Sequence, residues 1–233
     1  MERLERAFEN CEKLQRHMHF LLNKGGLYKV YNGNLLYHGC VPLKEDGNLK
    51  SVRIFGRSYK GKGLYEVLES YVRKGFYAMD PKEKERGKDI MWYIWLSENS
   101  PLFGKDKMAT FERYFLAEKE THKEKKNPYY LLLEDEKVVE KILKEFGLEN
   151  EDAHIINGHV PVKCKDGENP VKCGGKVLVI DGGFSKAYQK ETGIAGYTLI
   201  YNSYGLILAA HKHLSLQKQR SKRKVIFIRT ARW

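Results

Sequence analysis

The sequence is poor in cysteine and proline, and it contains no long hydrophobic run. Only four of its 233 residues are cysteine and six are proline, and so few cysteines exclude a disulfide-stapled secreted domain. No uncharged apolar stretch approaches the roughly 18–20 residues that span a bilayer. The first ten residues, MERLERAFEN, lack the apolar core of a secretory signal. We therefore expect a cytoplasmic protein without a membrane span.

Sequence motifs for zinc and for nucleotides are missing as well. Cys164 and Cys173 lie nine positions apart, which is not a zinc-knuckle spacing, and we interpret all four cysteines as reduced thiols. The chain has neither a phosphate-binding P-loop nor a dinucleotide-binding G-x-G-x-x-G. The segment DGGFSKAY does not replace them, because it lacks the glycine spacing that opens a phosphate-cradling helix.

Positive charge is abundant but unevenly spread. The net charge is +12, which favours a polyanionic or phosphorylated partner. Residues 211–233 contain eight basic residues and no acidic one: Lys212, Lys218, Arg220, Lys222, Lys224, Arg223, Arg229 and Arg232. Subtracting these eight charges leaves +4 for the first 210 residues. The basicity therefore belongs mostly to the tail.

Hydrophobic spacing and turn residues predict an α/β fold, with α+β as the alternative. Residues 3–23 carry apolar side chains at three- and four-residue steps, which is typical of one amphipathic helix. Asn32-Gly33 between two β-like runs predicts a hairpin, because both residues accept a positive φ. Further helices are expected over 63–79, 81–95 and 135–146, and strands over AHIIN, KVLVIDGG, GIAGYTLIYNS and GLILAAHKH. This order of elements indicates a mixed sheet flanked by helices.

Two further expectations concern the middle of the chain. Trp92, Tyr93 and Trp95 lie together in an apolar stretch, and we expect at least two of them to be buried in a hydrophobic helix. Residues 118–128 form a charge run, which is typical of a solvated segment.

Two histidines occupy similar places in the sequence. His38 follows the strand-like run NLLY, His159 follows HIIN, and each is adjacent to a glycine. An imidazole at a strand end can bind a metal ion, although a lone histidine there is more often a structural residue. Asp181 is a further possible ligand, but we favour a role in holding its own turn.

Several cations beside glycine- or proline-containing turns are candidates for phosphate recognition. They are Lys105, Arg113, Lys163, Lys172 and Lys186. Arginine can hold a phosphate through two parallel hydrogen bonds, and lysine acts as a point charge. Each residue on its own is more often a solvated surface charge.

Five blocks of the chain resemble the C-terminal part of class III fructose-1,6-bisphosphatase, a family of the calcineurin-like metallophosphatase superfamily. The blocks are LLYHGCVP (35–42), SPLFGKDKMATFERYF (100–115), IINGHVPVK (155–163), GENPVK (167–172) and VIDGGFSKAYQKETGIAGYTLIYNSYGL (179–206). The resemblance covers residues 1–213. It implies the C-terminal half of a fold in which mixed β-sheet layers are flanked by helices. We separate residues 214–233 as a basic tail, either non-native or disordered.

The resemblance also implies a chemistry. Such enzymes hold two divalent metal ions, commonly Mn²⁺, and hydrolyse fructose 1,6-bisphosphate to fructose 6-phosphate and phosphate in gluconeogenesis. Their ligands come in five blocks, namely D-x-H, G-D-x-x-D-R-G, G-N-H-D/E and two separate histidines. His38 matches the fourth block and His159 the fifth, so both would bind the same metal. Arg113 is the first candidate for substrate phosphate by analogy with other members, followed by Lys105 and Lys186.

We expect the first three ligand blocks to be absent. The chain would then be the back part of an enzyme, with negligible phosphatase activity alone, and its partners would be a sugar bisphosphate and either a separate N-terminal half or further copies of itself. Two alternatives are kept. One is a nucleic-acid-binding module that uses the basic tail, although nucleic acid is the less favoured partner. The other is a non-catalytic regulator that pairs with a separately encoded front half.

Overall fold

The computed structural model describes residues 1–184, 186–203, 205–211 and 224–228. Its centre is a five-stranded mixed sheet with the order β1-β2-β5-β7-β6. These strands are β1 (Tyr28–Tyr31), β2 (Asn34–Tyr37), β5 (His154–Asn157), β7 (Val177–Val179) and β6 (Val171–Lys172). The three central strands run parallel, and the two outer strands run antiparallel to their neighbours. This arrangement confirms the α/β class and the mixed sheet.

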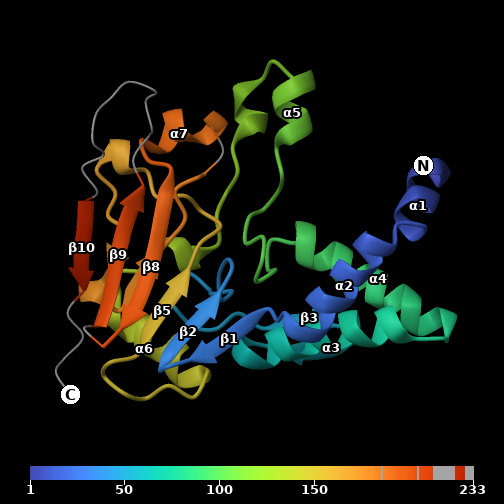
Figure 1. Ribbon diagram of the computed structural model, residues 1–233, viewed down its shortest axis with the longest axis horizontal. Coiled ribbons are helices and arrows are strands. Elements are labelled where there is room, and N and C mark those ends of the chain that lie inside the picture. The colour runs from blue at the N-terminus through green and yellow to red at the C-terminus, as the bar shows by residue number, and fades with distance from the viewer. Residues whose placement is uncertain (185, 204, 212–223, 229–233) are drawn as a thin grey trace.

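A second sheet packs beside the first and shares its core. It has the order β10-β9-β8 and consists of β8 (Gly196–Asn202), β9 (Gly205–His211) and β10 (Lys224–Ile228) (Figure 1). Tyr197 and Leu208 of this sheet belong to the same buried cluster as Leu35 and Ile155 of the first. All residues of β5 and β7 are buried. Since successive side chains of a strand point to opposite faces, both faces of the central sheet are covered there.

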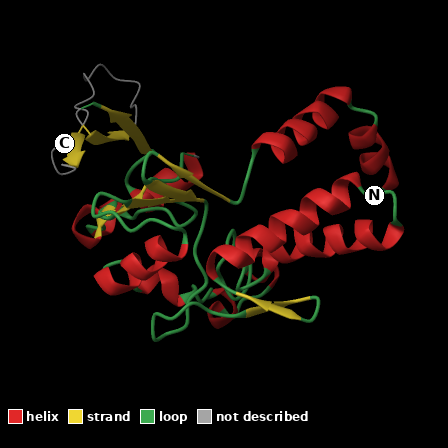
Figure 2. Cartoon of the chain, turned by 90° about the horizontal axis from the view of Figure 1, so that it is seen from below, coloured by secondary structure: helices red, strands yellow, loops and turns green. Residues whose placement is uncertain are grey.

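The α-helices are α1 (Glu2–Glu9), α2 (Glu12–Lys24), α3 (Gly61–Tyr77), α4 (Pro81–Leu96), α5 (Thr110–Phe115), α6 (Glu136–Glu145) and α7 (Lys186–Thr192). The first four helices gather on the side remote from the second sheet, whereas α6 and α7 lie close to the sheets, as Figure 1 shows and Figure 2 presents from below. Helix α6 begins at the side chain of Asp135, which accepts hydrogen bonds from two backbone amides. Its buried residues Val138, Val139, Ile142 and Leu143 join the main core.

The smaller elements complete the fold. Strands β3 (Val52–Ile54) and β4 (Arg57–Tyr59) form a separate hairpin. The described residues also form the 3-10 turns η1 (Lys119–His122), η2 (Pro128–Leu131), η3 (Cys164–Asp166) and η4 (Cys173–Gly175). No helix among the described residues is both long and apolar enough to cross a membrane.

Helices α3 and α4 cross at a pair of glycines. A Cβ atom placed on Gly75 would lie 2.5 Å from the Cα of Gly87 and 3.1 Å from the carbonyl oxygen of Glu83. Because these neighbours are backbone atoms, they cannot rotate away as a side chain could. The crossing therefore depends on two residues without side chains, and it brings the helices together over a second small core that contains Leu64, Leu68, Ile90 and Ile94.

Several sequence predictions are confirmed. Asn32 and Gly33 both have positive φ, at 48° and 71°, and they join β1 to β2 in the expected hairpin. The helices expected over 63–79, 81–95 and 135–146 are α3, α4 and α6, and the four strands expected near the C-terminus are β5, β7, β8 and β9.

Two other predictions are wrong. The segment 3–23 is not one helix, because the backbone of Cys11 is extended (φ −90°, ψ 93°) and separates α1 from α2. Trp92 and Trp95 are not buried: 62% and 59% of their surfaces are exposed. Helix α4 turns Gly87, Ile90 and Ile94 inward instead, so the aromatic side chains lie on its outer face.

The basic tail lies mostly outside the described residues. Within it, Lys224–Ile228 form β10 and pair antiparallel with β9, with Lys224 opposite Ala210 and Ile228 opposite Leu206. The boundary at residue 213 between a domain and a tail stays a prediction.

Candidate metal centre

The two predicted histidines come together at one edge of the central sheet. His38 directly follows β2, and His159 lies two residues after β5. These strands are parallel neighbours, with Leu36 opposite Ile156, so their carboxyl ends meet at the same edge, where α/β proteins bind ligands. Nε2 of His38 and Nδ1 of His159 lie 3.0 Å apart, although 121 positions separate the two residues in sequence.

The backbone around this edge is closely tied. The amide of Gly158 donates a hydrogen bond to the carbonyl of His38 at 2.9 Å. The buried side-chain amide of Asn157 donates to the carbonyl of Gly39 at 3.0 Å. His159 has a φ of +67°, a left-handed conformation that costs a non-glycine residue energy and that clusters at functional sites. Sequence reasoning missed Asn157, whose only signal is a polar residue at the end of an apolar strand.

Burial and charge hold both imidazoles toward the neutral form. Partial burial lowers the pKa of His38, while the carboxylate of Asp181 acts in the opposite direction. Partial burial also lowers the pKa of His159, and the neighbouring His38 and Lys105 lower it further. A hydrogen bond with the backbone of Phe103 and the charge of Asp181 act in the opposite direction on the pKa of His159. Neutral imidazole is the form that binds metal ions.

Asp181 has the turn role that the sequence favours. Its Oδ1 accepts a hydrogen bond from the amide of Gly183 at 2.9 Å, which closes an Asx turn after β7. The residue also lines an open cavity of about 580 Å³ together with His38 and His159. The aspartate therefore contributes a negative charge to the cavity that holds both imidazoles.

The two imidazoles fit a divalent cation incompletely. Imidazole nitrogens bind such ions at about 2.0–2.1 Å, so two of them at a right angle around one ion lie about 3.0 Å apart, as these two do. The described residues contain no cluster of three or more His, Cys, Asp or Glu side chains placed to hold a metal ion. This chain can therefore supply part of a metal site.

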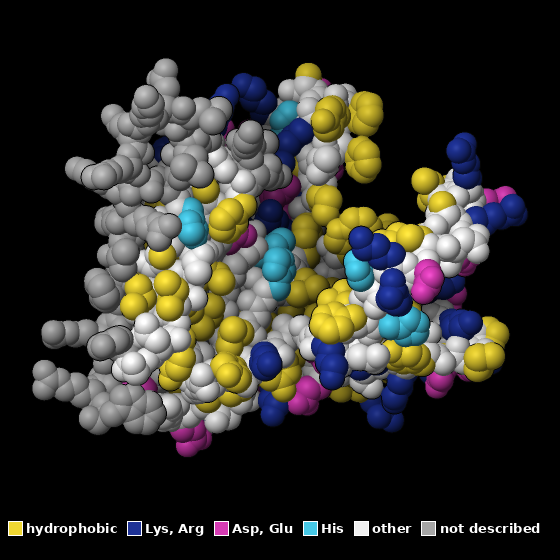
Figure 3. All heavy atoms as spheres, viewed as in Figure 1, with side chains coloured by type: hydrophobic (Ala, Val, Ile, Leu, Met, Phe, Trp, Pro, Cys, Tyr) yellow, Lys and Arg dark blue, Asp and Glu magenta, His cyan; other side chains and the backbone are white. Residues whose placement is uncertain are grey.

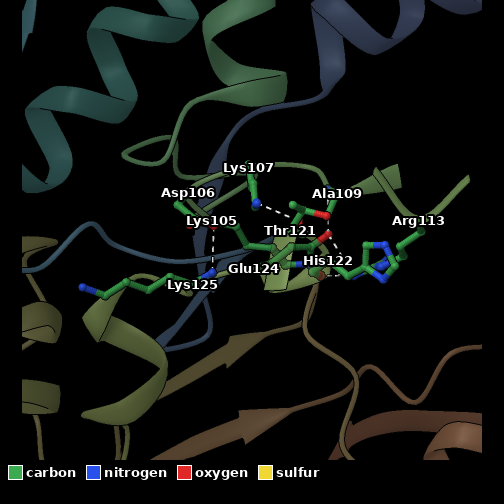
Figure 4. A network of polar contacts seen from close by, with 9 residues as sticks. All are labelled: Lys105, Asp106, Lys107, Ala109, Arg113, Thr121, His122, Glu124 and Lys125. Atoms are coloured by element: carbon green, nitrogen blue, oxygen red, sulfur yellow. Dashed lines mark hydrogen bonds and ion pairs between the residues drawn. The ribbon is translucent and has the colours of Figure 1, made fainter. Parts of the chain in front are cut away.

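Among the predicted phosphate-binding cations whose side chains are described, none lines the histidine cavity: these are Lys105, Arg113, Lys163 and Lys172. Lys105 and Arg113 both contact Glu124, at 3.0 Å and 3.2 Å. Figure 4 shows this carboxylate between them. Lys105 is the closer of the two to the candidate site, since its charge acts on His159. Lys186 begins α7, and its side chain lies outside the described part of the structure.

The sequence profile of one protein family matches residues 1–232, and its description is Firmicute fructose-1,6-bisphosphatase. The chain belongs to this family. A class 3 fructose-1,6-bisphosphatase of Clostridium botulinum (strain Hall) is 59% identical over 216 residues, which cover 92% of this chain and 32% of that relative. The corresponding protein of Clostridioides difficile (strain 630) is 58% identical over 213 residues, or 91% of this chain and 32% of the relative. No solved structure matches the chain.

The chain spans about a third of the length of the curated family members that it matches. Of the three other ligand blocks implied by the family resemblance, the two longer ones are absent from the sequence. The expectation that D-x-H is also absent is wrong, because Asp152-Ala153-His154 has this spacing. His154 begins β5, whereas His159 follows the other end of the strand. This triplet is therefore not beside the histidine pair.

The charge run at 118–128 contains one acidic residue that is not simply solvated. The side chain of Glu124 is only 15% exposed. Burial alone would raise its pKa, but hydrogen bonds from Lys105 and the amide of Ala109, together with the charges of Lys105 and Arg113, outweigh burial and lower it. Glu124 thus binds the amide of Ala109 just before α5 and the side chain of Arg113 in its last turn, and so holds the helix against the segment that follows it.

We expect this tie to weaken in acid. A carboxyl group with a lowered pKa in the folded state stabilises the fold fully above its ordinary pKa of 4.5 and loses that contribution as the pH falls through the folded value. The protection of the amides of residues 105–126 against hydrogen exchange, corrected for the pH dependence of the intrinsic exchange rate, should therefore fall below about pH 4.5. Glu124→Gln should show fast exchange already at pH 7. Glu120→Gln is the control, because Glu120 pairs with Lys123 at an exposed site, and a change of equal size in this variant would contradict the assignment.

Proposed function

We propose that this chain supplies part of the metal centre of an enzyme that hydrolyses fructose 1,6-bisphosphate to fructose 6-phosphate and phosphate in gluconeogenesis. The observation that carries the proposal is the 3.0 Å approach of His38 Nε2 and His159 Nδ1 at the carboxyl edge of the sheet. The names of the family members support the substrate. The proposed setting is the cytoplasm, and the proposed metal is Mn²⁺.

Each residue at the edge has a distinct part in this proposal. His38 and His159 hold one divalent cation through their facing nitrogens. Such a cation acts as a Lewis acid toward the phosphoryl group. Gly158 ties the ends of the two strands together, since its amide donates a hydrogen bond to the carbonyl of His38. Asn157 fixes the loop that follows β2 relative to β5.

The remaining metal ligands come, in this proposal, from a segment outside these 233 residues. Two imidazoles form a weak, open site, because metal affinity rises with the number and the preorganisation of the ligands. Lys105, Arg113 and Lys186 remain candidates for contacts with substrate phosphate. Arg113 would have to leave Glu124 to make such a contact, whereas Lys105 already lies close enough for its charge to influence His159.

A chimera tests this function directly. The chain would replace the matching third of the Clostridium botulinum relative, with which it shares 59% identity. We expect the purified chimera to release phosphate from fructose 1,6-bisphosphate when Mn²⁺ is added and to lose activity in EDTA. The 233-residue chain alone should release no phosphate above background.

Two results would overturn the proposal. One is a well-folded chimera that binds Mn²⁺ but releases no phosphate from fructose 1,6-bisphosphate. The other is phosphate release that is unaffected by EDTA. The unaltered relative, assayed in parallel, serves as the positive control.

A further inference from the structure

Two lysines face each other in the segment beside the histidine cavity. Lys105 and Lys126 are partners in an isolated antiparallel bridge. The flanking hydrogen bonds, Asp106 N to Lys125 O and Asn127 N to Gly104 O, are both 2.9 Å and make Lys105 and Lys126 a non-hydrogen-bonded pair. In such a pair the two side chains leave the same face with Cβ atoms about 4.5–5.5 Å apart. Like charges in that position repel each other.

The two carboxylates that act on Lys126 from a distance, those of Glu124 and Glu168, are both engaged by other groups. Both oxygens of Glu124 are engaged, one by Lys105 and the other by Arg113 and the amide of Ala109. Glu168 is engaged as well, by the side chain of Lys172 at 3.1 Å and by the amide of Lys163 at 2.9 Å. Among the described residues, Lys126 has no ion-pair partner within 4.0 Å.

A third lysine adds to this positive charge. Partial burial lowers the pKa of Lys126; Glu168 acts in the opposite direction, and the charges of Lys163 and Lys105 lower it further. Lys105 and Lys163 therefore both lie within electrostatic reach of Lys126, and we call these three residues the lysine cluster. They come from three places in the sequence, and a bound anion would relieve their mutual repulsion.

The lysine cluster lies beside the candidate metal centre. Leu102 lines the histidine cavity three residues before Lys105, and the ring of Phe103 packs 6.3 Å from that of His159. Lys163 follows His159 by four residues. A small molecule in the cavity could thus place a second charged group near the lysine cluster.

We propose that the lysine cluster is an anion subsite that binds the phosphate which stays on the sugar, with Lys126 as its principal free cation. This inference rests on the proposed function, in which one phosphate of the sugar bisphosphate reacts at the metal centre and the other is retained in the product. The subsite takes a phosphate monoester dianion. Lys126 binds this group directly, and Glu124 and Glu168 position the other two lysines.

Product binding in the absence of metal tests the subsite. Fructose 6-phosphate would be titrated calorimetrically into the full 233-residue chain in EDTA. We expect binding that weakens with added salt, and an affinity at least about tenfold lower in Lys126→Gln, since a charge-assisted contact to phosphate is lost. Lys125→Gln is the matched control, because Lys125 is the adjacent lysine and its side chain extends away from the Glu124 network (Figure 4). It should retain affinity within about twofold. Thermal unfolding would verify that both variants fold.

Three results would overturn the subsite. They are undiminished affinity in Lys126→Gln, an equal loss in Lys125→Gln, and no binding by the unaltered chain. None of these outcomes depends on phosphate release by the chimera, so the subsite and the proposed function can fail separately.

Discussion

Replacing His159 with alanine should lower the Mn²⁺-dependent phosphatase activity of the chimera more than about 100-fold, because loss of a ligand exceeds the 10- to 100-fold cost of losing a residue that only supports one. His38→Ala should have the same effect. His17→Ala is the control, since His17 is exposed on α2. Electron paramagnetic resonance of free Mn²⁺ would report on metal binding independently of catalysis.

The double variant makes this prediction more specific. If His38 and His159 hold the same ion, the double variant should have nearly the same residual phosphatase activity as either single variant. The reason is that the effects of residues that act as a unit do not add. Independent losses that multiply would contradict a shared ion. Full activity in either single variant would remove the histidine pair from the mechanism.

A single methyl group at Gly75 should strongly destabilise the helical layer. Helix α3 offers a matched pair of glycines, because a Cβ at Gly63 would meet nothing within 4 Å, whereas one at Gly75 would meet the backbone of α4 at 2.5 Å. Gly63→Ala should stabilise the chain by about 0.5–1 kcal/mol through helix propensity. Gly75→Ala has the same gain in helix propensity, but the clash with the backbone of α4 outweighs it. The net effect should be a loss of about 1–3 kcal/mol in the free energy of unfolding.

Urea unfolding followed by circular dichroism would measure both free energies. Compared with the unaltered chain, the urea concentration at the midpoint of unfolding should be lower for Gly75→Ala and higher for Gly63→Ala. Equal effects of the two substitutions would mean that the helices separate easily at their crossing. Gly87→Ala tests the same contact from α4, since its Cβ would lie 2.7 Å from the Cα of Gly75.

Helix α5 carries exposed aromatic side chains, although the charge run at 118–128 follows it in the sequence. Phe111, Tyr114 and Phe115 are largely exposed, and Figure 3 shows apolar side chains gathered there. In sequence these aromatics are ambiguous, because TFERYF suits a helix or a strand. In the structure this segment is a short helix, and the side chain of Glu124 accepts a hydrogen bond from the amide of Ala109 at the start of that helix. The sequence around Glu124 does not distinguish it from the solvated charged residues beside it.

Local signals determined much of this protein. Asn32-Gly33 predicted a hairpin because positive φ is a property of those two residues, and the periodic apolar residues of 135–146 predicted α6 because helix formation on an amphipathic face depends on neighbours in sequence. The placement of His38 and His159 after apolar strands, and the resemblance of the surrounding blocks to one family, were likewise available from the residues alone.

Only the tertiary structure decided which of these elements meet. Parallel pairing of β2 with β5 joins segments more than a hundred positions apart, and no turn signal specifies it. That pairing places the two imidazoles 3.0 Å apart. The close approach of Gly75 to Gly87 selects the inward face of α4 and leaves Trp92 and Trp95 outside. The ion pairs of Glu124 with Lys105 and Arg113 also depend on tertiary packing. Contacts between residues distant in sequence are set by how whole elements pack and not by the composition of any one segment.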